Sequence, residues 1–158
     1  ELLQQMPIFG AVADDALAFL VDAAPTAFVR AGAYFFHEGD AATSMFVIEA
    51  GRVIVARRWH DHEMLVRRFG PGDCFGEMAL LDLYPRSASV RAEADCTAIE
   101  LAPDNLLRLF EHDAEQFALI QMNIAREMSR RLRATDELLF RARMGDAPPA
   151  PEGLGAPT

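Results

Sequence analysis

The chain has 158 residues, about half of them apolar, and a formal net charge of −9 from 24 acidic residues against 15 arginines and no lysine. This length favours a single domain, and no apolar run approaches the roughly 18 residues that span a bilayer. The negative charge disfavours DNA binding as the main activity, so an anionic ligand would depend on local donors. Cys74 and Cys96 are too few and too widely spaced for a disulfide framework or a metal pair, which favours a reducing, cytoplasmic compartment.

Residues 1–25 are expected to form short helices, because apolar side chains recur at helical spacing until Pro25. Residues 26–102 change character: short β-prone runs alternate with glycine-containing turn signals about every eight to twelve residues, as in a β-sandwich or barrel. The expected strands are 26–30, 34–37, 44–49, 52–58, 64–69, 74–75, 87–94 and 97–101. Eight short strands of this kind predict an antiparallel jelly roll.

The C-terminal part is expected to be helical. Pro103 is a favoured first helical residue and opens a short helix to residue 111, and a long helix follows over about 114–144. A seam near heptad spacing suggests a homodimer through this long helix; it comprises Phe117, Ile124, Met128, Leu132, Thr135, Leu138 and Ala142. The arginines at 130–133 are interpreted as a solvated helix face, and the proline- and glycine-rich residues 145–158 as a disordered tail. The predicted fold class is thus α+β, a jelly roll flanked by N-terminal helices and a long C-terminal helix.

The most informative stretch is 75–81, followed shortly by 86–90. Gly76 lets the backbone approach a ligand without a Cβ in the way. A short helical turn over 77–81 would present unpaired amide groups, which attract an anion. Arg86 adds a planar, permanently charged fork that matches phosphate oxygens.

Glu77 is unexpected in an anion site, since a carboxylate repels phosphate unless it has another partner. A sugar hydroxyl attached to that phosphate is such a partner, and Ser87 adds a hydroxyl donor beside Arg86. Amides, an arginine and one acid together indicate a phosphate plus a ribose, which means a nucleotide.

These residues resemble the phosphate-binding cassette of cyclic-nucleotide-binding domains, which occur in catabolite activator proteins, regulatory subunits of cyclic-AMP-dependent kinases and cyclic-nucleotide-gated channels. The family pattern F-G-E-x-A-L, a short gap, then P-R-x-A-[ST]-V is matched at every position over residues 75–90. The resemblance covers roughly residues 1–143, implies the same jelly roll, and defines a domain over 1–144 with N-terminal helices at 1–25, the roll at 26–102 and C-terminal helices at 103–144.

The resemblance also implies the roles of individual residues. Glu77 would accept a hydrogen bond from the ribose 2′-OH, and Arg86 would pair with the cyclic phosphate. Ser87 and the neighbouring backbone would complete the phosphate cradle. The implied ligand-binding residues are Phe75, Gly76, Glu77, Met78, Ala79, Arg86, Ser87 and Ala88.

Thr135 is a further candidate for the ligand. In catabolite activator proteins, the long helix carries a threonine–serine pair after an Arg-Arg-Leu run, and this pair contacts the adenine. Here the run at 130–132 is followed by Thr135 at the matching spacing, but Asp136 replaces the serine. Thr135 is therefore expected either to contact the base or to be a polar residue in the dimer seam.

The function predicted from these features is a cyclic-nucleotide sensor whose ligand repositions the long helix. Cyclic AMP is the preferred ligand, and the hydroxyl of Ser87 leaves cyclic GMP open. No helix-turn-helix follows residue 144, so the chain is expected not to bind DNA directly and to signal to an unidentified effector protein or parent-chain domain. The alternative is a ligand-free dimerisation module on the same fold.

Other chemistries have weaker support in the sequence. No serine lies in a G-x-S-x-G elbow, and no enzymatic activity is expected. His60-Asp61-His62 has the H-x-H spacing of some metal sites, but it lies between two expected strands and is interpreted as a solvated hairpin turn. No cofactor or metal is predicted.

Overall fold

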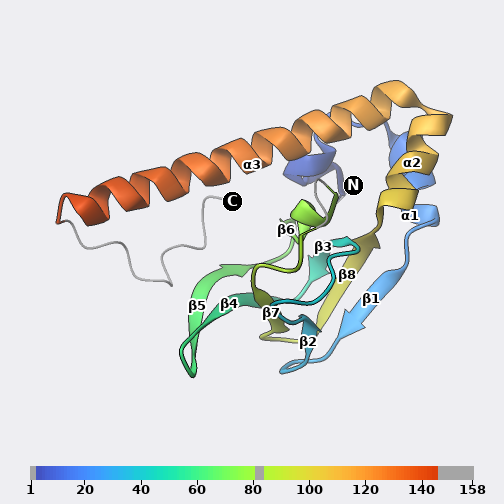
Figure 1. Cartoon of the computed structure of the whole chain (residues 1–158). Coiled ribbons are helices and arrows are strands. Elements are labelled where there is room, and N and C mark those ends of the chain that lie inside the picture. The colour runs from blue at the N-terminus through green and yellow to red at the C-terminus, as the bar shows by residue number, and fades with distance from the viewer. Residues whose placement is uncertain (1–2, 81–83, 146–158) are drawn as a thin grey trace.

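The computed structural model describes residues 3–80 and 84–145 and shows two packed β-sheets with helices along one side (Figure 1). The helical segments are the 3-10 turns η1 (Leu3–Gln5), η2 (Pro7–Phe9) and η3 (Glu77–Leu80), and the α-helices α1 (Asp14–Asp22), α2 (Pro103–His112) and α3 (Ala114–Arg143). The strands are β1 (Thr26–Val29), β2 (Tyr34–Phe36), β3 (Met45–Ala50), β4 (Val53–Trp59), β5 (His62–Phe69), β6 (Cys74–Phe75), β7 (Ser89–Ala92) and β8 (Cys96–Leu101). The predicted fold class is confirmed.

The two sheets have the strand orders β1-β8-β3-β6 and β2-β7-β4-β5, and all of these pairings are antiparallel. The first sheet is covered on both faces, which explains why four consecutive residues of β3 are buried. Met45 and Val47 belong to the core shared with the helices, whereas Phe46 and Ile48 belong to the core between the sheets. Alternating side chains of one strand thus serve two cores, as the period of a strand requires.

The helices cover the outer face of the first sheet, and α3 is tied to the N-terminal turns by a buried amide. Asn123 Nδ2 donates to the carbonyl oxygens of Ile8 at 3.1 Å and Gly10 at 2.9 Å. Asp113 caps α3 by accepting a hydrogen bond from the backbone N–H of Gln116 at 3.2 Å. Because its first half is fixed in this way, α3 has a defined direction, and its C-terminal half extends past the sheets (Figure 1).

The expected dimer seam is divided between two environments. Ile124 is buried, and Phe117 and Met128 pack against the same core, so this half of the seam is covered by the chain itself. Leu132 is 62% exposed, and the neighbouring Leu139, Phe140 and Met144 are also exposed. Helical periodicity marked the apolar positions correctly but did not distinguish an internal partner from an external one.

The His60–His62 triplet forms a tighter turn than expected. Only His60 and Asp61 form the turn, His60 adopts the left-handed conformation with φ 55°, and His62 already pairs with Trp59 as the first residue of β5. Within residues 3–80 and 84–145, no group of three or more histidine, cysteine or acidic side chains is arranged to hold a metal ion.

The disordered tail predicted for residues 145–158 lies outside the described residues except for Gly145. Among the described helices, none combines the length and the apolar character that crossing a bilayer requires.

Candidate functional site

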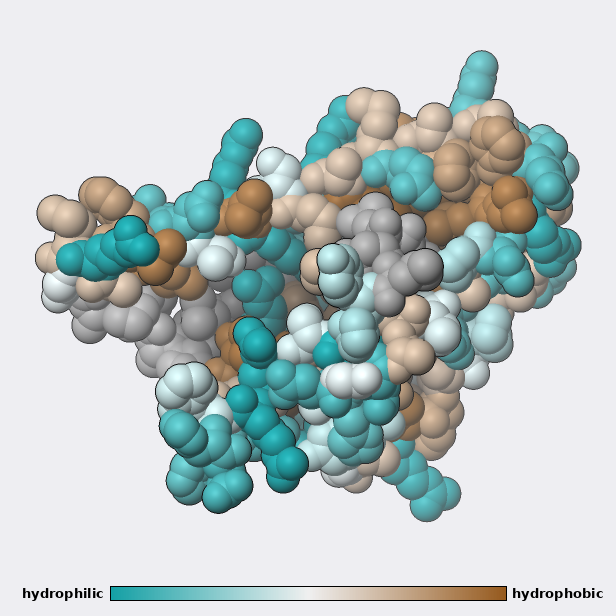
Figure 2. Space-filling view, viewed as in Figure 1, coloured by the Kyte–Doolittle hydropathy of each residue, from teal (hydrophilic) through white to brown (hydrophobic). Residues whose placement is uncertain are grey.

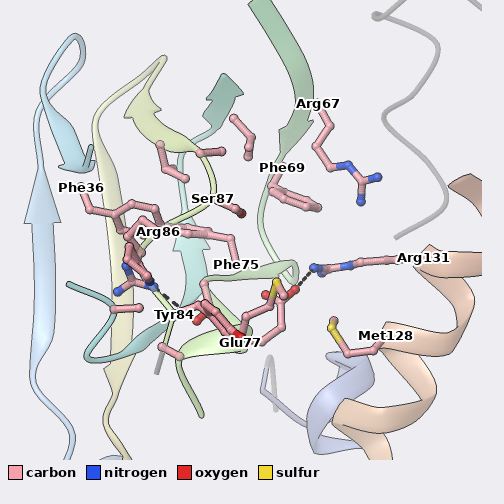
Figure 3. Close-up of a pocket in the computed structure, with 18 residues that line it drawn as sticks. Phe36, Arg67, Phe69, Phe75, Glu77, Tyr84, Arg86, Ser87, Met128 and Arg131 are labelled. Atoms are coloured by element: carbon pink, nitrogen blue, oxygen red, sulfur yellow. Dashed lines mark hydrogen bonds and ion pairs between the residues drawn. The ribbon is translucent and has the colours of Figure 1, made fainter. Parts of the chain in front are cut away.

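A cavity of about 430 Å³ lies between the second sheet, η3 and the middle of α3 (Figure 3). This volume is within the usual range for small-molecule sites. The eight residues of the predicted cassette that were assigned to the ligand all line it: Phe75, Gly76, Glu77, Met78, Ala79, Arg86, Ser87 and Ala88. The structure therefore brings the two halves of the motif together around one space.

Thr135 is the predicted site residue that does not line the cavity. It is exposed on α3, and its hydroxyl donates to the backbone carbonyl of Arg131 at 3.0 Å. This bond to the preceding turn is common for a helical threonine. The contact between Thr135 and a base stays a prediction.

Both the backbone conformation and the close packing at position 76 require a glycine. Its φ is +77°, a region that side chains disfavour, and a Cβ would lie 2.7 Å from Arg86 Nη1. The turn that follows is already closed by a hydrogen bond from the Ala79 amide to the Gly76 carbonyl at 3.1 Å. The amide of Ala79 is thus engaged within η3 and is not a spare donor for an anion.

Arg86 is buried and held in place from several directions. Nη2 donates to the Ser44 carbonyl at 2.6 Å and Nη1 to the Gly76 carbonyl at 3.3 Å. The guanidinium also lies over the ring of Phe36, 3.9 Å from its centroid. Burial lowers the pKa of Arg86, and attraction to Asp40, Glu100 and Glu77 opposes that effect. The side chain is therefore a preorganised cation at the wall of the cavity.

Glu77 forms an ion pair with Arg131 of α3. Glu77 Oε1 lies 2.5 Å from Arg131 Nη1, and the two side chains are only 9% and 11% exposed. Arg131 also donates to the Cys74 carbonyl at 2.8 Å and to Glu127 at 3.1 Å, and it lies over the ring of Phe69. This pair joins η3 directly to the long helix (Figure 3).

The charges around Arg131 reinforce its protonated form. Burial acts to lower the pKa of Arg131, but the attraction of Glu77 and Glu127, with the hydrogen bond to Glu127, outweighs it and the pKa is raised. Burial also raises the pKa of the Cys74 thiol to about 12, so this group is neutral at physiological pH. Cys74 and Cys96 are both free and buried.

Arg131 and Arg67 are the functional candidates that the sequence analysis missed. Arg131 was interpreted as part of a solvated helix face, and this interpretation is wrong for that residue. Helical spacing did indicate an inward position for Arg131, because this residue lies seven residues after the buried Ile124 and four after Glu127. Arg67 shares a strand face with the buried Phe69, two residues away, and lines the cavity with it.

The model of the cyclic nucleotide-binding domain family matches residues 27–113, more than half of the chain. The chain belongs to this family. Its cyclic nucleotide-binding domain is 33% identical over 107 residues to the cAMP-dependent protein kinase regulatory subunit of Emericella nidulans, covering 68% of this chain and 26% of that protein. It is 32% identical over 150 residues to a CRP-like cAMP-activated global transcriptional regulator of Mycobacterium tuberculosis, covering 94% of this chain and 65% of the regulator.

The fold is shared with solved members of the family. The crystal structure of the Thermus thermophilus catabolite activator protein superposes with a TM-score of 0.77 at 28% identity, covering 87% of this chain and 63% of that chain. The domain thus spans less than two thirds of each of these three relatives. These matches confirm the family resemblance seen in the sequence.

Proposed function

We propose that this domain is a cyclic-nucleotide sensor that binds its ligand in the cavity and passes the signal through α3. Arg86 and Ser87 bind the cyclic phosphate, and Glu77 accepts a hydrogen bond from the ribose 2′-OH. The cavity is lined beyond the cassette by Val55, Phe69 and Met128, which offer an apolar surface for the base. The domain acts by binding rather than by catalysis, as the names of its curated relatives suggest.

The observation that carries this proposal is a pair of unsatisfied polar atoms at the cavity. In the described part of the chain, three buried side-chain polar atoms lack a hydrogen bond: Glu77 Oε2, Arg86 Nε and Glu93 Oε2. Glu93 is in an ion pair with Arg68 instead. The two remaining atoms are one acceptor and one charged donor, which are the groups needed for a ribose hydroxyl and a phosphate. A ligand that satisfies them removes a cost of about 1–3 kcal/mol for each.

The proposed signal uses the two oxygens of Glu77 separately. Oε1 accepts a hydrogen bond from Arg131, whereas Oε2 is buried without a partner among the described residues and would accept from the ligand. A hydroxyl on Oε2 alters the charge distribution and position of the same carboxylate that holds α3. The ligand shifts the helix to the extent that its affinity differs between the two helix positions.

A ligand titration tests the proposal. We expect cyclic AMP or cyclic GMP to give a saturable heat of binding, with 5′-AMP as the control that lacks the cyclic phosphate. At a ligand concentration 100 times the Kd, the free energy of unfolding rises by about 2.7 kcal/mol, which corresponds to roughly 5–10 °C in Tm. If neither cyclic nucleotide gives heat or a Tm shift, the ligand-free interaction module becomes the better function.

The choice of base is part of the proposal. The names of the fungal and mycobacterial relatives mention cyclic AMP and support the preference expected from the sequence. Ser87 lines the cavity and leaves cyclic GMP open, as the sequence analysis stated. The residues that face the base, rather than the cassette, must decide between the two.

The proposed partner of the projecting half of α3 is a second copy of the chain. Figure 2 shows hydrophobic side chains at the end of this helix, and Leu132, Leu139 and Phe140 are each more than half exposed. We expect sedimentation equilibrium to show a dimer that Leu132→Glu with Leu139→Glu abolishes, because the interface between the two copies would desolvate two charges. Leu107→Glu, at an equally exposed position on α2, is the control. A wild-type chain that stays monomeric at high concentration, with and without nucleotide, contradicts this proposal and leaves an effector protein as the partner.

A further inference from the structure

A second buried acid, Glu127, lies next to the Glu77–Arg131 ion pair. It belongs to α3, and its side chain is only 4% exposed. Its Oε1 accepts from Arg131 Nε at 3.1 Å, and its Oε2 pairs with the half-exposed Arg130. Glu127 does not line the cavity, so the proposed ligand contacts give it no role. A buried carboxylate is costly unless it is paired, and one of its two partners is the arginine that also holds Glu77.

The nitrogen atoms of Arg131 are divided among three acceptor residues. Nε donates to Glu127, and Nη1 donates to Glu77 Oε1 at 2.5 Å. Nη2 donates to the carbonyl oxygen of Cys74 at 2.8 Å and lies 3.6 Å from its sulfur. Two N–H groups of a guanidinium frequently bind both oxygens of one carboxylate. Here Nε and Nη2 are engaged elsewhere, so Arg131 holds Glu77 by one oxygen.

The second oxygen of Glu77 has a different environment. Oε2 is buried and has no hydrogen-bond partner among residues 3–80 and 84–145. Figure 3 shows Glu77 at the cavity, with Arg131 reaching it from the side of α3. Oε2 is the oxygen assigned to the ribose 2′-OH in the proposed function. If Arg131 bound both oxygens of Glu77, the hydroxyl would have to displace a charged donor, whose hydrogen bond is the stronger one.

We propose that Glu127 is a positioning residue for nucleotide binding, which holds Arg131 by Nε and thereby keeps Glu77 Oε2 open to the ribose hydroxyl. This inference rests on the proposed function and extends it to a residue outside the cavity. Glu127 lies four residues before Arg131 on one helix, so the two side chains meet on the same face independently of η3. The direction of the guanidinium is therefore set within α3, and Glu77 meets its Nη1 end.

The affinity ratio between a cyclic ribonucleotide and its 2′-deoxy analogue isolates this role. The analogue lacks the hydroxyl assigned to Glu77 and is otherwise the same ligand. A loss of net charge near the cavity, or a less stable α3, acts on both ligands alike and cancels from the ratio. A purely structural role of Glu127 would therefore leave the ratio unchanged.

The test is a calorimetric titration of whichever of cyclic AMP and cyclic GMP binds more tightly, and of its 2′-deoxy analogue. For the wild-type chain we expect the ribonucleotide to bind about 10- to 150-fold more tightly, as one hydrogen bond to a charged group implies. Glu127→Met has a similar length but no carboxylate, and the ratio should fall toward one. Glu137→Met removes an exposed acid of the same helix, which pairs with Arg141, and should keep the wild-type ratio.

Glu127→Gln is the second variant, in case Glu127→Met does not unfold cooperatively. It keeps an acceptor oxygen for Arg131 Nε but loses the charge, and a neutral acceptor binds about half as strongly. We expect its ratio to lie below that of the wild type and above that of Glu127→Met.

Two outcomes overturn the inference. The first is a wild-type ratio in Glu127→Met, or in Glu127→Gln if that is the variant that folds. The second is a wild-type chain that binds the two ligands equally, which removes the ribose contact of Glu77 but leaves cyclic-nucleotide binding in place. A wild-type chain that binds neither cyclic AMP nor cyclic GMP overturns the sensor and this inference together.

Discussion

Replacing Arg86 with alanine is expected to weaken cyclic-nucleotide binding roughly 10- to 150-fold. The reason is the loss of a charged hydrogen bond to the phosphate, worth about 1.5–3 kcal/mol. The side chain is fixed by the carbonyls of Ser44 and Gly76 and by the ring of Phe36, so the wild-type domain does not have to order it when ligand binds. Isothermal titration calorimetry of the variant gives the affinity directly.

A matched control is needed because Arg86 also supports its surroundings. Arg91→Ala removes a half-buried arginine from β7 that does not line the cavity. We expect Arg91→Ala to bind nucleotide as the wild type does. If Arg86→Ala keeps the wild-type affinity while its thermal unfolding remains cooperative, the phosphate binds elsewhere and the assignment of the cassette is wrong.

Arg131→Ala is expected to lower the free energy of unfolding by about 3–5 kcal/mol, the usual cost of removing one partner from a buried ion pair. Both Glu77 and Glu127 are buried, and each would lose a charged partner at once. Urea denaturation measures the change, and Arg133→Ala, at an exposed position on the same helix, should stay within about 0.5 kcal/mol of wild type.

A double-mutant cycle separates the Glu77–Arg131 contact from its surroundings. Glu77→Gln, Arg131→Met and the combined variant give a coupling energy, and we expect it to be in the range of 0.5–3 kcal/mol found for residues in one network. Additive effects of the two substitutions would show that α3 is held to the domain by its apolar contacts and by Asn123, and that Glu77 does not transmit a signal to it.

The strands and the cassette were accessible to sequence reasoning because their signals are local. Alternating apolar residues between glycine turns predicted all eight strands, and the 75–90 motif placed eight residues around one cavity. Arg131 was harder to assign, because its partner Glu77 is 54 residues away in the sequence. A charged residue on a helix is usually solvated, and only the packing of α3 against η3 buries this one.

Two other differences between the sequence-based prediction and the structure also depend on contacts between residues that are distant in the sequence. The apolar seam of α3 was read as one interface, but the N-terminal turns cover its first half, and periodicity does not report what lies opposite a helix face. Arg67 was overlooked since an arginine in a strand is normally an exposed residue. Its inward direction follows from the pairing of β4 with β5, which fixes Phe69 in the core and places Arg67 on the same face.

The proposed movement of α3 would be amplified along the helix, because Arg131 lies beside the cavity and the helix continues well beyond it. No described residue of the helix beyond Arg131 is buried, so the twelve residues from there to Arg143 form an arm of about 18 Å. A tilt of about 10° at Arg131 would move the end of this arm by about 3 Å. Van der Waals contacts lose a quarter to a half of their energy when a gap opens by about 0.5–1 Å. A rearrangement too small to disturb the β-roll would therefore be enough to make or break an interface at the far end of the helix.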